Sequence, residues 1–172
     1  MHSNERAKII NDPIYGFIEI DKGIINDLIN HEYFQRLRRI SQLGLSYLVY
    51  PGAQHTRFQH ALGCLYLMKK ALLQLENKGH IITKEEKEGV QIAILLHDIG
   101  HSPFSHALER TLIKNIGHEE ITLMYMHRFN EIFNGKLSMA IKIFNNDYHK
   151  KFLYQLVSSQ LDLDRLDYLK RD

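Results

Sequence analysis

Residues 95–109 read LLHDIGHSPFSHALE and directly follow the apolar pair Ala93 and Ile94. The preceding pattern indicates a buried helix, yet the stretch holds five titratable residues: His97, Asp98, His101, His106 and Glu109. Titratable side chains at positions that packing would fill with apolar ones point to a chemical role. The stretch therefore predicts a buried helix that ends at a metal or catalytic centre.

Boundary signals flank this helix on both sides. Thr83 and Glu86 have the spacing of a capping box and predict its start. Gly100 stands where we expect the helix to stop. Ser102 and Pro103 then supply an N-cap and a first-turn proline, so they predict that a further helix follows.

Helical periodicity also governs most of the remaining chain, with apolar residues three and four positions apart. Two short helices are expected to meet near His31, and the stretch LGLSYLVYPGAQHTRF reads as a loop before the next helix. Later helices are expected at residues 119–129, 137–144, 150–157 and 163–171. Residues 1–22 contain AKIINDPIYGFIEI, which predicts extended segments around a turn. The pattern predicts an all-α protein with a small extended element at its N-terminus, forming a single domain over residues 1–172.

Composition bounds the class of protein. The chain has 172 residues, of which 44% are hydrophobic and 24% charged, as in ordinary globular domains. Its formal charge of +2 is too small to predict nucleic-acid binding by itself. The lone cysteine, Cys64, excludes an internal disulfide, and no stretch has the length of a membrane span or a signal peptide. We expect a cytoplasmic protein without membrane contact. Because LDYLKRD ends the chain inside an amphipathic pattern, the natural domain is expected to continue.

The titratable stretch suits a metal ion. Imidazole nitrogens and carboxylate oxygens are the ligands of catalytic divalent cations. His97 and Asp98 supply two ligands, and further ligands must come from other helices, where His60 and Asp164 are the candidates. Two histidines with two carboxylates accept iron, manganese, nickel, zinc or magnesium, so the pattern leaves the identity of the metal open.

The order of these residues, H, HD and D, resembles the signature of the HD phosphohydrolase superfamily. The stretches NDPIYG, FQRLRRISQLG, YPGAQHTRFQHALG, HDIGHSPFSHALE and DLDRLDYLKRD resemble, in that order, the deoxynucleoside triphosphate triphosphohydrolases of the superfamily, above all the branch that joins a sterile-alpha-motif domain to an HD domain. The resemblance runs from about Lys8 to the last residue. It implies an HD-domain helical bundle.

The resemblance also implies an activity and its residues. The reaction implied is hydrolysis of a dNTP to deoxynucleoside and triphosphate, with metal-activated water attacking the α-phosphorus. The implied metal ligands are His60, His97, Asp98 and Asp164. The implied reaction centre contains His101, His106, Glu109 and His118, with His106 as our candidate for protonating the departing sugar oxygen. Implied substrate contacts are Arg57 and Arg165 to phosphate, and Gln42, Tyr168 and Asp172 to the deoxyribose.

A regulatory nucleotide site is implied as well, in a homo-oligomer stimulated by an activating nucleotide. Its residues would be Lys8, Asn11, Gln35 and Arg38, with Val49 and Tyr50 at an adjoining site. Asn30 stands where relatives carry an aspartate that reads guanine, so this chain lacks the charge that pairs with guanine donors.

Alternatives stay open at this point. An isolated His-Asp pair is usually structural, and for His118 a surface position is nearly as consistent with the sequence as a position in the site. Cys64 is interpreted as a buried thiol rather than a nucleophile. An HD phosphohydrolase could act on another nucleotide or phosphate ester, and a non-catalytic nucleotide-binding or nucleic-acid-binding module is the hypothesis from a different class.

Overall fold

The N-terminal element is a β-hairpin. The computed structural model describes residues 7–103 and 116–171. Strands β1 (Lys8–Asp12) and β2 (Gly16–Ile20) pair antiparallel, with Lys8 opposite Ile20. The carboxylate of Asp12 accepts hydrogen bonds from the backbone N–H groups of Ile14, at 2.9 Å, and Tyr15, at 3.1 Å. These bonds close the turn, and the predicted extended element is confirmed.

Two short helices follow the hairpin and meet at His31, as predicted. Helix α1 (Ile24–Asn30) ends at this residue and α2 (Glu32–Gln35) begins from it. The His31 ring nitrogen Nδ1 accepts from the Tyr33 N–H at 3.3 Å and so caps α2. Two 3₁₀ turns, η1 (Arg36–Arg39) and η2 (Ser46–Leu48), lie in the segment that leads to the long helix α3.

Helices α3 (Arg57–Asn77) and α4 (Lys84–Leu96) pack against each other and carry much of the buried core. Thr83 and Glu86 form the predicted capping box at the start of α4. A second capping box, Thr56 with Gln59, starts α3. From Gly89 to Leu96 the buried residues of α4 are all glycine or apolar, which places the chain immediately after the helix inside the molecule.

The end of α4 differs from the prediction. The helix stops at Leu96, four residues before Gly100, and the chain turns through backbone hydrogen bonds from Ile99 N–H to Leu96 C=O and from His101 N–H to Asp98 C=O. The reason is a buried contact with a later helix: the Thr122 hydroxyl donates to the His97 carbonyl and accepts from the Gly100 N–H, both at 3.0 Å. This contact ends the helix, and the side chains of His97 and Asp98 then point toward the same place.

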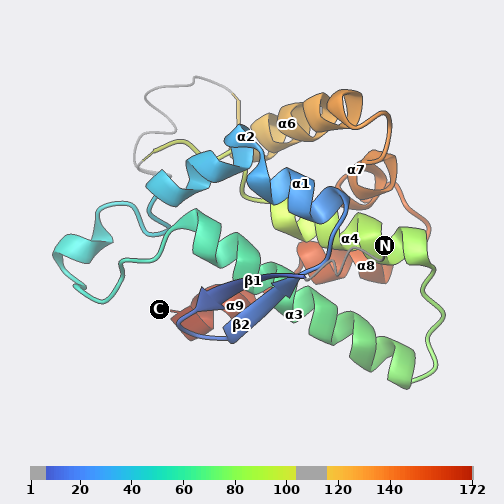
Figure 1. Cartoon of the computed structure of the whole chain (residues 1–172), viewed down its shortest axis with the longest axis horizontal. Helices are drawn as coiled ribbons and strands as arrows, with labels where there is room; N and C mark the ends of the chain where they lie inside the picture. Colours follow the sequence, from blue (N-terminus) through green and yellow to red (C-terminus); the bar gives the residue numbers. More distant parts are fainter. Residues whose placement is uncertain (1–6, 104–115, 172) are drawn as a thin grey trace, which may run out of the picture.

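Four later helices complete the described fold: α6 (His118–Ile132), α7 (Ser138–Phe144), α8 (Lys151–Val157) and α9 (Leu163–Arg171). Helices α7 and α8 pack on α4, whereas α9 packs on α3 (Figure 1). All four confirm predicted helices. The helix predicted after Ser102 and Pro103 lies outside the described residues. In the part of the chain that is described, no helix has the length and hydropathy that crossing a membrane requires.

Candidate metal centre

Three helix segments bring their ligand atoms to one point. His60 lies in the second turn of α3, His97 follows the last residue of α4, and Asp164 lies in the first turn of α9. His60 Nε2 lies 2.9 Å from Asp164 Oδ1 and 3.3 Å from His97 Nε2. His97 Nε2 lies 3.5 Å from Asp164 Oδ1. The three atoms thus form a tight triangle of imidazole and carboxylate donors.

Asp98 completes one side of this triangle. Its carboxylate oxygens lie 3.6 Å from His60 Nε2 and 3.6 Å from His97 Nε2. The guanidinium of the buried Arg57 forms an ion pair with Asp98, and His101 Nε2 lies 3.3 Å away. Burial alone would raise the pKa of Asp98, but the charges of His97 and Arg57 and the hydrogen bond with His101 lower it well below its usual range. Asp98 is therefore ionised and held in place.

The two histidines are oriented through their other ring nitrogens. His97 Nδ1 lies 2.6 Å from the Ile94 carbonyl, which can only accept, so Nδ1 carries the proton and Nε2 faces the centre. His60 Nδ1 lies 2.7 Å from the buried carboxylate of Asp167. A carboxylate or carbonyl behind a histidine is the usual outer partner of a metal ligand.

The pKa values of the two histidines and of Asp164 show that the carboxylates here attract positive charge. Burial disfavours charged imidazole, yet the charge of Asp98 and the hydrogen bond with Asp164 raise the pKa of His97 to about 9. The pKa of His60 is raised as well, because its hydrogen bonds with Asp164 and Asp167 outweigh burial. Burial would raise the pKa of Asp164, but its hydrogen bonds with His60 and His97 lower it. The centre thus demands positive charge, which a cation can supply in place of protons.

The donor set fits a divalent cation. Metal bonds of about 2.0–2.2 Å to imidazole nitrogen and carboxylate oxygen set neighbouring ligand atoms roughly 3 Å apart. The separations of 2.9 to 3.6 Å among His60, His97, Asp98 and Asp164 match that spacing.

Cys64 lies beside the centre but suits it poorly. Its Sγ is 3.6 Å from His60 Nε2, and it belongs to the group of possible ligand atoms within 4.8 Å of one another that also includes His97 and Asp164. Burial, followed by the nearby carboxylates, raises the pKa of its thiol well above the usual value. The thiol instead donates toward the Leu163 carbonyl at 3.8 Å. The neutral thiol agrees with the interpretation of Cys64 as a buried packing residue.

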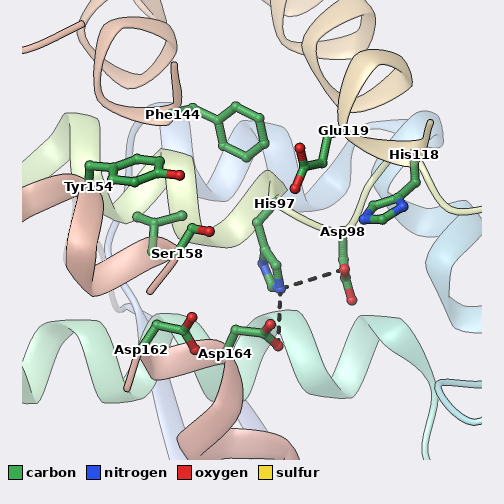
Figure 2. A pocket seen from close by; sticks show the side chains of 10 residues that line it. His97, Asp98, His118, Glu119, Phe144, Tyr154, Ser158, Asp162 and Asp164 are labelled. Carbon is green, nitrogen blue, oxygen red and sulfur yellow. Dashed lines mark ion pairs between the residues drawn. The ribbon is translucent and has the colours of Figure 1, made fainter. Parts of the chain in front are cut away.

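A cavity of about 130 Å³ opens onto the centre. Figure 2 shows His97, Asp98 and Asp164 pointing toward one another, with Phe144 and Tyr154 on the opposite side of the cavity. This volume is smaller than the roughly 300–1,000 Å³ typical of a whole small-molecule site. The cavity therefore has room for only part of such a ligand.

The structure brings some of the other predicted residues to the centre. The His118 ring stacks on the His101 ring with centroids 4.1 Å apart, and His118 lines the cavity. Arg57 contacts Asp98. Gln42 lies between η1 and η2, where its N–H donates to the His55 carbonyl at 3.1 Å, and its buried Oε1 has no hydrogen-bond partner among the described residues. Of the remaining predictions, Arg165 is exposed and Tyr168 half-buried on α9, whereas His106, Glu109 and Asp172 lie outside the described residues.

Two of the predicted regulatory residues contact the end of α1: Gln35 Nε2 donates to the Ile29 carbonyl at 2.6 Å, and Lys8 contacts the next residue, Asn30. Lys8 Nζ donates to Asn30 Oδ1 at 2.6 Å, and Arg38 Nε donates to Gln35 Oε1 at 2.7 Å. Asn11 is exposed on β1. Val49 and Tyr50 are also exposed, in the segment after η2.

Sequence reasoning missed four residues at or behind the centre. Glu119, Tyr154 and Asp162 line the cavity, and Asp167 supports His60. Asp167 is fully buried although it lies in the charged pattern LDRLDYLKR, which reads as a surface helix. Its one signal was its position three residues after Asp164, on the same face of α9.

Comparisons with known proteins agree with this arrangement. The family model for the HD domain matches residues 57–172. A solved phosphohydrolase of Bacteroides thetaiotaomicron is 61% identical, with a TM-score of 0.95, over 97% of this chain and 41% of its own. The human deoxynucleoside triphosphate triphosphohydrolase SAMHD1 is 34% identical over 98% of this chain and 33% of its own.

An uncharacterized protein of Bacillus subtilis, YwfO, is 35% identical over 96% of this chain and 39% of its own length. The chain thus spans about a third to two fifths of these relatives. Since the HD-domain match covers His60, His97, Asp98 and Asp164 together, the chain belongs to the HD-domain family.

Proposed function

We propose that this chain is the metal-dependent catalytic core of a phosphohydrolase that cleaves a dNTP to deoxynucleoside and triphosphate. The observation that carries the proposal is the convergence of His60 Nε2, His97 Nε2 and Asp164 Oδ1 within 3.5 Å, beside a paired Asp98. The dNTP as substrate rests on the motif resemblance and on the relatives named as deoxynucleoside triphosphate triphosphohydrolases.

The proposed metal ligands are His60, His97, Asp98 and Asp164. A divalent cation bound there would lower the pKa of a water and neutralise charge on phosphoryl oxygens. The paired Arg57 keeps Asp98 ionised and aimed at the centre, because its guanidinium holds the carboxylate inside the protein. Arg57 is also the candidate for a phosphate contact, since its positive charge lies against Asp98, which lines the cavity.

Protons would pass through the histidines beside Asp98. Burial, which outweighs the contact with Asp98, lowers the pKa of His101, so this imidazole is neutral at physiological pH. A neutral imidazole can accept a proton, and the stacked His118 lies next to it. His106 keeps the proposed role of general acid toward the sugar oxygen, with His101, Glu109 and His118 in support.

Deoxyribose contacts are proposed for Gln42, Tyr168 and Asp172, and a phosphate contact for Arg165. Among the described residues the buried Gln42 Oε1 has no hydrogen-bond partner, which supports this, because a sugar hydroxyl could donate to it. The cavity of about 130 Å³ accommodates the reacting phosphoryl group, and the rest of a nucleotide would extend beyond it. An activating nucleotide, bound by Lys8, Asn11, Gln35, Arg38, Val49 and Tyr50 in a homo-oligomer, stays part of the proposal.

The products of hydrolysis test the proposal. The chain is incubated with Mn²⁺ and either dATP or dGTP, and the products are separated by ion-exchange chromatography. Triphosphate with free deoxynucleoside is the expected result, and His97→Ala, which removes a ligand, should release neither. Monophosphate with pyrophosphate, or diphosphate with phosphate, would overturn the cleavage position. Hydrolysis only of other phosphate esters would overturn the dNTP as substrate.

A further inference from the structure

A chain of buried charges lies behind the centre, outside the proposed ligand set. It consists of Asp12 at the end of β1, and Asp167 and Arg171 on α9. Asp12 is 4% exposed, Asp167 is fully buried, and the Arg171 side chain is 1% exposed. Burying three charges is costly unless each is paired, and none of them contacts the cavity described above.

The contacts link these residues in series to a ligand. Asp167 Oδ2 lies 2.7 Å from His60 Nδ1 and accepts from Arg171 Nε at 2.7 Å. Arg171 Nη2 then lies 3.0 Å from Asp12 Oδ2. The same Nη2 donates to the Gln59 carbonyl at 3.0 Å, one residue before His60. Arg171 therefore connects both carboxylates with the backbone that carries the ligand.

The hairpin anchors the far end. Asp12 uses Oδ1 to accept from the Ile14 and Tyr15 N–H groups, which leaves Oδ2 for Arg171. Figure 1 shows the hairpin alongside α9, and the contact between Asp12 and Arg171 joins them. The carboxylate that closes the turn thus also fixes the guanidinium.

Helix α3 carries a glycine at the point where these side chains pack against it. A β-carbon added at Gly63, less than one turn after His60, would overlap the Asp167 carboxylate and the Arg171 guanidinium. Glycine inside a helix costs about 0.5–1 kcal/mol relative to alanine, so the absence of a side chain here serves the close approach of α9. The arrangement depends on Gly63, Asp167 and Arg171 together.

The chemistry of such a series is to fix one tautomer and one ring orientation. Asp167 Oδ2, which accepts from Arg171 Nε, also faces His60 Nδ1 as an acceptor, so His60 keeps its proton on Nδ1 and directs Nε2 to the centre. A carboxylate behind a histidine also makes that histidine a stronger ligand. Arg171 holds the Asp167 carboxylate in place through its Nε hydrogen bond, and Asp12 holds the Arg171 guanidinium in place through Nη2.

We propose that Asp12, Arg171 and Asp167 form a positioning relay that holds His60 in its metal-binding orientation and ties the N-terminal hairpin to the centre. The inference rests on the proposed metal centre. It predicts that a change on the hairpin, at Asp12, alters metal binding at His60 although Asp12 contacts no ligand directly.

Two variants test the relay. Asp12→Asn keeps an oxygen for the Ile14 and Tyr15 bonds and removes the charge that faces Arg171. Asp167→Asn removes the charge behind His60 with little change of shape. Asp147→Asn, at an exposed acidic residue, is the control with the same change of charge. Each folded variant is titrated with Mn²⁺ by calorimetry, and its Co²⁺ complex is examined by absorption spectroscopy, which reports ligand geometry.

We expect Asp167→Asn to weaken Mn²⁺ binding about 10- to 100-fold, as loss of an outer partner of a metal ligand does elsewhere. Asp12→Asn should weaken it less, and both should change the Co²⁺ spectrum, whereas Asp147→Asn should match wild type. Wild-type affinity and spectrum in either relay variant would overturn the relay. Failure of the wild-type chain itself to bind Mn²⁺ or Co²⁺ would instead overturn the metal centre on which it rests.

Discussion

His60 on α3 and Asp164 on α9 place Nε2 and Oδ1 2.9 Å apart, which joins the first and last helices of the centre. Replacing Asp164 with alanine removes one donor and leaves His60 and His97 without that carboxylate. The variant should lose bound metal and triphosphate release by at least the roughly 10–100-fold that loss of an outer partner costs. Elemental analysis and product assay check this, with Asp147→Ala as the control. Full activity in Asp164→Ala would contradict the ligand assignment.

Cys64 should not be needed for metal binding. Its buried thiol is kept protonated and points toward the Leu163 carbonyl. Cys64→Ala should therefore retain the metal content and the Mn²⁺ affinity of wild type, with only the modest loss of stability that a small cavity causes. Calorimetric titration with Mn²⁺ distinguishes a ligand set without Cys64 from one that includes its sulfur. A variant that folds but no longer binds metal would place the sulfur among the ligands.

The Thr122 hydroxyl should hold the turn that carries His97. Replacing Thr122 with valine keeps the shape but leaves the His97 carbonyl and the Gly100 N–H unpaired inside the protein. The free energy of unfolding should fall by about 1–3 kcal/mol, measured by urea denaturation, and metal affinity should fall with it. Thr122→Ser retains the hydroxyl and should recover most of both. Equal stability of the valine variant and wild type would count against this role.

Gly100 should not tolerate a side chain. A β-carbon there would overlap the His118 carbonyl and the Thr122 backbone nitrogen, neither of which can rotate away. Gly100→Ala should cost roughly 1–3 kcal/mol in unfolding free energy, as overpacking does, and should displace His118 from His101. Gly52→Ala is the matched control, since nothing lies within 4 Å of its added carbon. Comparable melting temperatures for the two variants would contradict the close packing.

Stability should fall in acid through Glu86, which is remote from the centre. Burial would raise the pKa of Glu86, but hydrogen bonds from Lys150, Tyr148 and the Thr83 N–H lower it to about 2. Since the unfolded value is about 4.5, the stabilisation is complete above pH 4.5 and disappears as pH falls toward 2.

The test compares melting temperatures of wild type and Glu86→Gln across this range. The variant should be less stable at neutral pH, by on the order of 1–3 kcal/mol for lost charge-assisted hydrogen bonds, and the difference should shrink in acid. Glu131→Gln, at an exposed ion pair with Arg128, should show little difference at any pH. A constant difference for Glu86→Gln would refute the pKa assignment.

Local patterns were sufficient to predict most of the fold. The capping box at Thr83 and Glu86, the helix junction at His31 and the extended start of the chain all depend on neighbouring residues, and the structure has them. The early end of α4 could not be predicted in this way, because it depends on a hydroxyl from α6. The start of α3 likewise depends on neighbouring residues, because Thr56 and Gln59 form its capping box.

The same distinction between local and long-range contacts applies to the residues of the metal centre. The motif pattern brought together His60, His97, Asp98 and Asp164, which the structure gathers at one point. Asp167 was missed because its burial requires α9 to pack on α3 at Gly63, a contact that no local pattern encodes.

Metal content is the most direct test of the central claim. The chain and its Asp98→Ala variant are purified, equilibrated with Mn²⁺, freed of loose metal by gel filtration and subjected to elemental analysis. The account predicts stoichiometric metal in the wild-type chain and its loss from Asp98→Ala with the helical content unchanged. Equal metal in both proteins, or none in a folded wild-type chain, would contradict it.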